Sequence, residues 1–308
     1  MNGYEALHQS AAWLNVSSRG KIAALGEDRA RLLHAMTSNH IQQLEPGQGC
    51  YAFFLNAQGR ILGDVHVFCR PDFLLLDTEP ETRRKLFEHL DKYIIADDVA
   101  LEDRTDSLVA IAVEGPNAAA LLASMGAPIP EADDAQLEWG TRLVVKTSLT
   151  GQPGFTVIAP AGEKPEVIAA VELAGAVAAT AEDFHVVRIE NGKPRYGEEI
   201  TERYLPQETG QMHALHFTKG CYLGQEIVER VRSRAQIHRH LMRVQIDGSE
   251  IPAAGTKLTA DGKDSAEIVS AVYSPSLGKV AAMAYVRTDF ARDGSTVQLL
   301  DRPALVKG

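Results

Sequence analysis

Residues 219–226 read KGCYLGQE and place a thiol among neighbours that favour its chemistry. Cys221 follows Gly220, stands two residues after Lys219 and precedes a predicted helix that begins at Gln225. A nearby cation and a helix N-terminus both stabilise the thiolate, which is the reactive and metal-binding form of cysteine. The pattern predicts a functional thiol at Cys221, and the alternative is an inert packing cysteine.

A second candidate is Asp64, in the segment RILGDVHVF. The alternation of a β-strand puts Asp64 and His66 on the face opposite Val65. Aspartate is disfavoured inside strands, and the adjacent Gly63 permits close approach of a ligand or of another backbone. Asp64 is therefore a candidate carboxylate for a basic nitrogen of a substrate, with a solvated strand face as the alternative.

The third candidate is a charged loop at residues 194–210, PRYGEEITERYLPQETG. It brings Tyr196 together with several carboxylates, among them Glu208. A carboxylate accepts two parallel hydrogen bonds from a planar N–C–N edge such as that of a pteridine, and a tyrosine ring can stack on its face. The alternative is a hydrated loop without a ligand.

A run of basic residues follows the KGCYLGQE motif. Its arginines are Arg230, Arg232, Arg234, Arg239 and Arg243. Such a run suits a phosphate or a polyglutamate tail, and a solvated helix face without a ligand is the alternative. The net charge of the 308-residue chain is −10, which argues against a general nucleic-acid-binding surface.

The three cysteines, Cys50, Cys69 and Cys221, are widely spaced and form no CxxC pair. This usage fits a reducing cytoplasm and provides no metal-ligand set within the chain. The N-terminus lacks a signal-peptide pattern, and no apolar run approaches the ~20 residues that span a bilayer. We therefore expect a cytoplasmic protein without a membrane segment.

The pattern of elements predicts how these candidates are positioned. Hairpins, such as the one at residues 51–68, alternate with short amphipathic helices as far as about residue 187, where an irregular charged loop begins. Beyond residue 240 the strands become short and separated by turns. We expect an α+β body at residues 1–240 and a small all-β unit at residues 241–308.

Several blocks of this sequence occur in the same order in one known superfamily. They include TSNHIQQLEPGQGCYAFFLNAQGRILGDVHVF, EGPNAAALL, TGQPGFTV, RIENGKPRYGEEITERYLPQE, KGCYLGQEIVERV and VYSPSLGKVAAMAYV. The chain resembles the glycine-cleavage T-protein (aminomethyltransferase) superfamily. Within it, the chain is similar to the YgfZ-type folate-binding proteins, whose mark is K-G-C-[YF]-x-G-Q-E. The resemblance implies two intertwined α+β units around a central channel, followed by a C-terminal β-barrel.

The resemblance also implies tetrahydrofolate, or a one-carbon derivative, as the bound cofactor. It assigns cofactor contacts to Asp64, Tyr196, Glu208 and Arg230, and catalytic roles to Cys221, Lys219 and Asp64. T-proteins usually carry two adjacent acids where this chain has Gly63-Asp64, so either position of that pair can match the folate-facing acid. T-proteins also typically carry an acid where this chain has Cys221.

Three functional hypotheses follow from the resemblance and its departures. The first is a tetrahydrofolate-binding protein that supports iron–sulfur cluster assembly or repair in client enzymes, including tRNA-modifying ones, with Cys221 as its thiol. The second is an aminomethyltransferase of a glycine-cleavage-type system. The third is a non-enzymatic module that binds tRNA or a protein partner through the arginine run. If the chain is an enzyme, the resemblance implies a folate-dependent one-carbon (aminomethyl) transferase.

Overall fold

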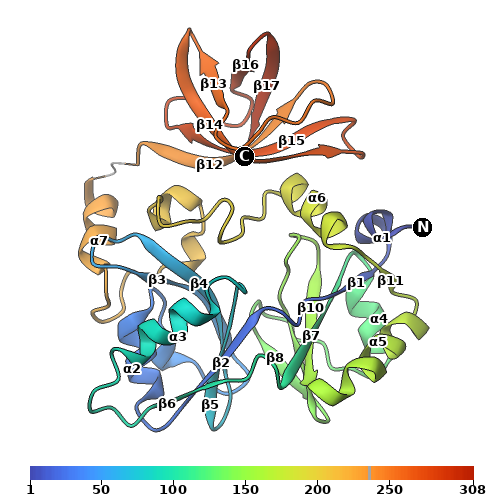
Figure 1. The fold of residues 1–308 in the computed structure, drawn as a ribbon, viewed down its shortest axis with the longest axis vertical. Helices are drawn as coiled ribbons and strands as arrows, with labels where there is room; N and C mark the ends of the chain where they lie inside the picture. The colour runs from blue at the N-terminus through green and yellow to red at the C-terminus, as the bar shows by residue number, and fades with distance from the viewer. Residues whose placement is uncertain (235–236) are drawn as a thin grey trace.

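The computed structural model describes residues 1–234 and 237–308. Figure 1 shows two α/β units on either side of the centre of the molecule, with a β-barrel above them at the C-terminal end of the chain. This arrangement confirms the predicted α+β body with a small C-terminal barrel. No helix within the described ranges is long and apolar enough to cross a bilayer.

The first unit is built on a five-stranded antiparallel sheet in the order β3-β4-β5-β2-β6. Its strands are β2 (Gly20–Leu25), β3 (Gly49–Leu55), β4 (Ile61–Cys69), β5 (Phe73–Thr78) and β6 (Ala100–Asp103). Its helices are α2 (Arg29–Met36), η1 (Ile41–Gln43) and α3 (Arg83–Asp91). The predicted hairpin at residues 51–68 is confirmed as β3 and β4. Val65 and Val67 of β4 pack with Leu33 and Leu86 of the helices, which leaves Asp64 and His66 on the opposite face.

The second unit is built on a six-stranded sheet in the order β11-β1-β7-β10-β9-β8. Its strands are β1 (Ala12–Asn15), β7 (Leu108–Glu114), β8 (Gln136–Trp139), β9 (Arg142–Val145), β10 (Gly154–Pro160) and β11 (Val177–Ala178). Its helices are α1 (Gly3–Gln9), α4 (Ala118–Ser124), η2 (Ala161–Glu163) and α5 (Lys164–Leu173). Because β1 precedes the whole first sheet in the sequence but pairs with β7, the two units are intertwined.

The segment between the second sheet and the barrel was expected to be an irregular loop from about Arg188 onward. The structure corrects this, because α6 (Ala181–Asn191) is helical as far as Asn191. A capping box at Thr180 and Asp183 begins the helix, and Gly192, with a φ of 68°, ends it. The chain then continues through η3 (Pro206–Thr209), η4 (Met212–Ala214) and α7 (Gln225–Arg234), and α7 begins where the sequence predicts.

The barrel closes in the order β12-β15-β14-β13-β16-β17. Its strands are β12 (Arg239–Ile246), β13 (Lys257–Ala260), β14 (Lys263–Ser274), β15 (Lys279–Arg287), β16 (Thr296–Leu299) and β17 (Arg302–Lys307). Tyr285 stacks on Tyr204 of the body with ring centroids 3.6 Å apart. Arg239, in the first barrel strand, donates to Glu208 at 2.8 Å. These contacts hold the barrel on the loop that follows α6.

Candidate functional site

A cavity of about 600 Å³ is lined by residues of both sheets and of α6 and its following loop. The residues that give it its chemistry are charged or hydrogen-bonding: Arg19, Tyr51, Asp64, His66, Glu79, Arg188, Arg195 and Glu198. A cavity of this volume, with a few convergent polar groups, is typical of a small-molecule site. We therefore take this cavity as the candidate functional site.

Asp64 is the central carboxylate of the cavity. It projects from β4 and is buried, and the Tyr51 hydroxyl of the neighbouring β3 donates to its Oδ2 at 2.6 Å. Burial raises the pKa of Asp64, and the negative charge of Glu79 raises it further. The hydrogen bond from Tyr51 and the charge of Arg19 act in the opposite direction. Asp64 is thus a carboxyl group whose proton is held more tightly than usual.

Glu79 has the opposite electrostatic environment. Burial opposes its ionisation, but Arg19 and Arg195 outweigh burial and hold the pKa of Glu79 below its usual value. Arg19 donates to Glu79 and also to Asp77 at 2.5 Å, and Arg195 donates to Glu79 at 2.9 Å. Two neighbouring carboxyl groups with pKa values shifted in opposite directions are a recurrent feature of acid–base sites.

Arg188 of α6 fixes the loop that forms another wall. Its guanidinium pairs with Glu198 and Glu199, each at 2.6 Å, and donates to the Lys193 carbonyl at 3.0 Å. The Oε2 of Glu199 that pairs with Arg188 also accepts the backbone N–H of Arg195 at 2.9 Å. A guanidinium can satisfy several acceptors in one plane, so Arg188 holds residues 193–199 against the cavity.

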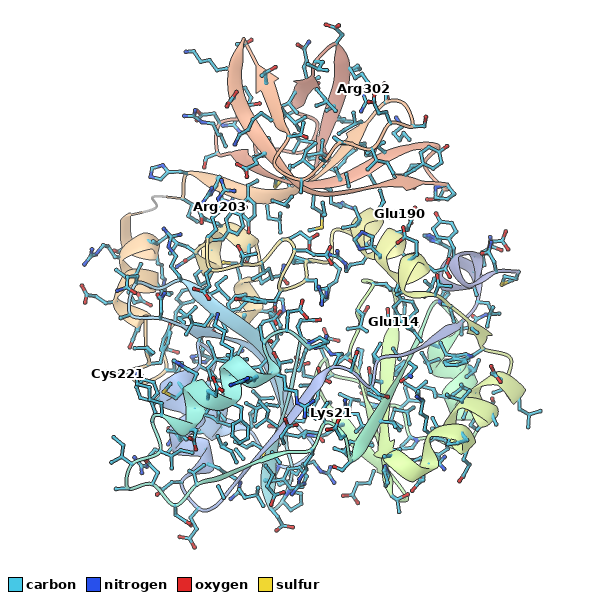
Figure 2. All side chains as sticks on the ribbon, in the orientation of Figure 1. Lys21, Glu114, Glu190, Arg203, Cys221 and Arg302 are labelled. Carbon is cyan, nitrogen blue, oxygen red and sulfur yellow. The ribbon has the colours of Figure 1, made fainter. Side chains whose placement is uncertain are left out.

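Glu114 fixes the wall that faces this loop, in the second unit (Figure 2). Its buried carboxylate accepts from the backbone N–H groups of Leu149 and Thr150 at 2.6 and 3.0 Å, and from the hydroxyls of Ser148 and Thr150. Burial raises the pKa of Glu114, while these donors lower it. Because Ser148 and Leu149 line the cavity, Glu114 sets the position of that wall.

Lys219 has a well-defined structural environment. Its buried ammonium donates to the backbone carbonyls of His34, Thr37 and Asn39, each at 2.6 Å. These carbonyls lie at and just after the C-terminal end of α2, where helical carbonyls lack intrahelical partners. Burial lowers the pKa of Lys219 to about 7, whereas the carbonyl oxygens favour the ammonium form. The ammonium thus joins the KGCYLGQE segment to α2 and does not line the cavity.

Cys221 is exposed. It lies in the turn before α7, and Figure 2 shows it at the outer edge of the first unit, on the opposite side of the molecule from Glu114 and Glu190. It is not among the residues that line the cavity. Cys221 is therefore accessible from solvent, and the structure does not bring it together with Asp64.

The other predicted cofactor contacts also lie away from the cavity lining. Tyr196 is buried in an apolar cluster with Tyr51 and Ile61, and its hydroxyl lies 3.5 Å from the Ile61 carbonyl. Glu208 is buried between the Leu205 N–H and Arg239. Arg230 is half-exposed on α7 and pairs with Glu226 at 2.6 Å.

The arginine run is largely engaged in ion pairs. Arg232 lies 3.6 Å from Glu229, and Arg239 is bonded to Glu208. The side chain of Arg234, which belongs to this run, lies outside the described residues.

Sequence reasoning did not identify Arg19, Glu79, Arg188 or Arg195 as cavity residues. Arg188 and Arg195 carried a signal, because both belong to the stretch that the sequence predicts to be a charged loop. The others stand in unremarkable local sequence, and their charges meet only because segments far apart in the chain fold together.

Comparison with known proteins agrees with this architecture. Residues 2–219 match the model of the GCVT N-terminal domain, and residues 239–303 match that of the glycine cleavage T-protein C-terminal barrel domain. The structure is similar to the crystal structure of the glycine cleavage system aminomethyltransferase T from Bartonella henselae. The TM-score is 0.89 at 20% sequence identity, over 99% of this chain and 87% of that one. This likeness shows the fold.

Curated relatives match over nearly the whole chain. An aminomethyltransferase of Rubrobacter xylanophilus is 28% identical over 97% of this chain and 82% of its own length. A putative chloroplastic transferase of Arabidopsis thaliana is 26% identical over 95% of this chain and 69% of its own length. Since the N-terminal family model alone covers more than two thirds of the sequence, the chain belongs to the family of the glycine cleavage T-protein.

Proposed function

We propose that the cavity binds tetrahydrofolate or a one-carbon derivative of it, with Asp64 as the carboxylate that meets a basic nitrogen of the ligand. The observation that carries this proposal is the buried Asp64 side chain on the wall of a cavity of about 600 Å³. The volume suits a ligand of this size. Membership of the T-protein family supports the ligand class.

The residues of the cavity fit this ligand. Tyr51 occupies Oδ2 of Asp64, and Oδ1 has no hydrogen-bond partner within residues 1–234 and 237–308, so it is available to a ligand N–H. The raised pKa of Asp64 is a shift in the direction expected for a carboxyl group that takes up and returns a proton. Tetrahydrofolate, when bound, supplies the carrier of the one-carbon unit. In this proposal Tyr196 and Glu208 brace the surrounding elements, and Arg230 lies outside the ligand contacts.

The binding proposal is tested by calorimetric titration of tetrahydrofolate into the wild type and Cys221→Ala under anaerobic conditions. We expect both proteins to bind with the same affinity, because Cys221 lies away from the cavity. Absence of binding to the wild type would disprove the proposal. A large loss of affinity in Cys221→Ala alone would disprove the separation of thiol and cavity.

We further propose that the chain is a YgfZ-type accessory protein for iron–sulfur client enzymes, including tRNA-modifying ones, and that Cys221 is its functional thiol. The exposure of Cys221 supports this role, because an exposed thiol is accessible to a partner protein. One thiol supplies one cluster ligand, so a shared cluster would take its other ligands from the partner.

The accessory role is tested by complementation. In cells that lack the protein, Cys221→Ala should fail to restore iron–sulfur enzyme activity, whereas Cys50→Ala should restore it. Cys50 is the matched control because burial raises the pKa of its thiol to about 12, which keeps it protonated and unreactive. Full rescue by Cys221→Ala would contradict the role proposed for the thiol.

The second candidate function is aminomethyl transfer, which is favoured by the relatives named aminomethyltransferase. Under this hypothesis the purified protein releases ammonia from an aminomethyl-loaded lipoyl carrier protein in the presence of tetrahydrofolate. No turnover in that assay would exclude it. Binding of tRNA is the weaker hypothesis, because several arginines of the run are engaged in ion pairs, and it would show as affinity that falls steeply with salt.

A further inference from the structure

A second acid–base group lies on the cavity wall beside Asp64. His66, two residues further along β4, lines the same cavity, and its Nδ1 lies 2.6 Å from Oδ1 of Asp134. The His66 ring contacts Tyr51, the residue that donates to Asp64, with a centroid separation of 4.9 Å. Asp134 comes from the segment that leads into β8, so the pair joins the two units.

The position of Asp134 is fixed by the backbone around it. Asp134 is one of the few non-glycine residues with positive φ, at 60°, a conformation that aspartate and asparagine tolerate better than most residues. The carbonyl of Asp134 lies so close to Gly49 that a Cβ there would come within 2.4 Å of it. Two residues further on, Gln136 donates through its side-chain amide to the Cys69 carbonyl and through its backbone N–H to the Gly47 carbonyl, both at 2.9 Å. The backbone that carries the Asp134 carboxylate is therefore anchored against the first unit.

We propose that His66 is a ligand-facing acid–base residue of this cavity and that Asp134 is its positioning residue. A carboxylate that accepts a hydrogen bond from Nδ1 keeps the proton of the neutral imidazole on that nitrogen, so the lone pair of Nε2 is free to accept. Nε2 of His66 has no protein partner within residues 1–234 and 237–308, and the residue lines the cavity. Nε2 is thus the atom that meets an N–H group of the ligand.

This inference rests on the proposed binding of a reduced pterin and adds a second proton site to it. In the transfer step a positively charged ligand nitrogen loses its proton: the N–H bond breaks while the Nε2–H bond forms, and the nitrogen keeps the electron pair and becomes neutral. The carboxylate of Asp134 offsets the charge of the imidazolium. The reverse step returns the proton to the ligand, so no oxidant or further reactant is needed.

Several charged and titratable groups face His66 from the neighbouring elements. They are Tyr51 on β3, Asp64 on β4, Asp77 on β5, Arg19 before β2, Glu79 after β5, His213 on η4 and Asp134 itself. Carboxylates outnumber cations in this set, so the charged groups around the imidazole are predominantly anionic.

The test combines a tautomer measurement with ligand titration on the full chain. In long-range ¹H–¹⁵N spectra, neutral His66 should carry its proton on Nδ1 in the wild type and partly on Nε2 in Asp134→Asn, which retains the left-handed backbone. Tetrahydrofolate affinity at neutral pH should fall about tenfold in His66→Phe, because a ligand N–H loses its acceptor. His238→Phe, at an exposed position, should leave the affinity for tetrahydrofolate unchanged.

Acidification provides the readout that a packing role would not change. Protonation of Nε2 removes the acceptor, so the affinity of the wild type should fall with decreasing pH more steeply than that of His66→Phe. A wild-type proton on Nε2, or equal affinity and pH dependence in His66→Phe, would overturn this inference alone. Failure of the wild type to bind tetrahydrofolate at any pH would overturn the proposed function and the ligand assigned to His66 with it.

Discussion

Substitution of Lys219 tests whether the lysine of the KGCYLGQE motif activates the thiol of Cys221 or stabilises the fold. Its three hydrogen bonds connect residue 219 with carbonyls 180 to 185 positions earlier in the sequence, around the end of α2. Substitution of Lys219 by methionine keeps an unbranched side chain, one atom shorter, and removes the ammonium that makes all three hydrogen bonds. The backbone carbonyls of His34, Thr37 and Asn39 would then lose this hydrogen-bond donor.

The expected loss of stability follows from these contacts. A hydrogen bond to a charged group contributes about 1.5–3 kcal/mol. Lys219→Met also removes the cost of desolvating the buried ammonium, which offsets part of the lost bonding, so we expect a net loss of about 3 kcal/mol. For a chain of 308 residues this corresponds to a decrease in Tm of about 5 °C. Urea denaturation followed by circular dichroism measures the free energy, and calorimetry measures Tm.

The control is Lys92→Met, at an exposed lysine, which should change the free energy of unfolding by less than about 0.5 kcal/mol. Alkylation of Cys221 by a neutral reagent, measured well below Tm, should change by less than about threefold in Lys219→Met. The structural role would be refuted if stability were unchanged while the alkylation rate fell more than about tenfold. That result would show that Lys219 activates the thiolate.

Two further predictions concern other buried groups. Glu114→Gln should lower the free energy of unfolding by about 1–2 kcal/mol and also weaken tetrahydrofolate binding. The amide can accept hydrogen bonds from only some of the donors of residues 148–150. An unaltered affinity in a calorimetric titration would contradict the role of Glu114 in the cavity wall. His34, which lies edge-to-face with His40 at 4.5 Å, has its pKa lowered to about 4, chiefly by burial and then by Lys219. In the unfolded chain the pKa of this histidine is about 6.5, so the unfolded chain binds the proton at a higher pH than the folded protein does. The stability contributed by neutral His34 is therefore fully present above pH 6.5 and is lost as the pH falls toward 4. The free energy of unfolding of the wild type, measured by urea denaturation, should decrease by about 2 kcal/mol across this pH interval, and the decrease should be smaller in His34→Gln. Parallel pH profiles for the two proteins would exclude His34 as the cause.

Features encoded within one element could be predicted from the sequence. The alternation in β4 was sufficient to separate Asp64 and His66 from Val65, and turn signals were sufficient to predict the hairpin and a separate all-β unit. That this unit is a barrel came from the resemblance to the T-protein superfamily. The start of α7 at Gln225 was also visible, because the glycine-bounded turn and the apolar spacing are local. These predictions needed no knowledge of which segments meet in space.

Features that depend on distant segments could not be predicted. The short spacing between Lys219 and Cys221 suggested a direct electrostatic effect, but the ammonium is bonded to carbonyls near α2. Glu79 lies between Arg19 and Arg195, which are remote in sequence from each other. Helix α6 was not predicted, because its last turn, with Arg188 and Glu190, was assigned to the charged loop that follows.

The central claim is that Asp64 in this cavity binds a reduced folate, and Asp64→Asn tests it most directly. The substitution preserves the shape of the side chain and removes the charge that a basic ligand nitrogen would meet. Calorimetric titration of tetrahydrofolate at neutral pH should show affinity at least tenfold lower in Asp64→Asn than in the wild type, and unchanged affinity in Asp72→Asn at an exposed position. Equal affinities in Asp64→Asn and the wild type, with the fold intact, would contradict the claim.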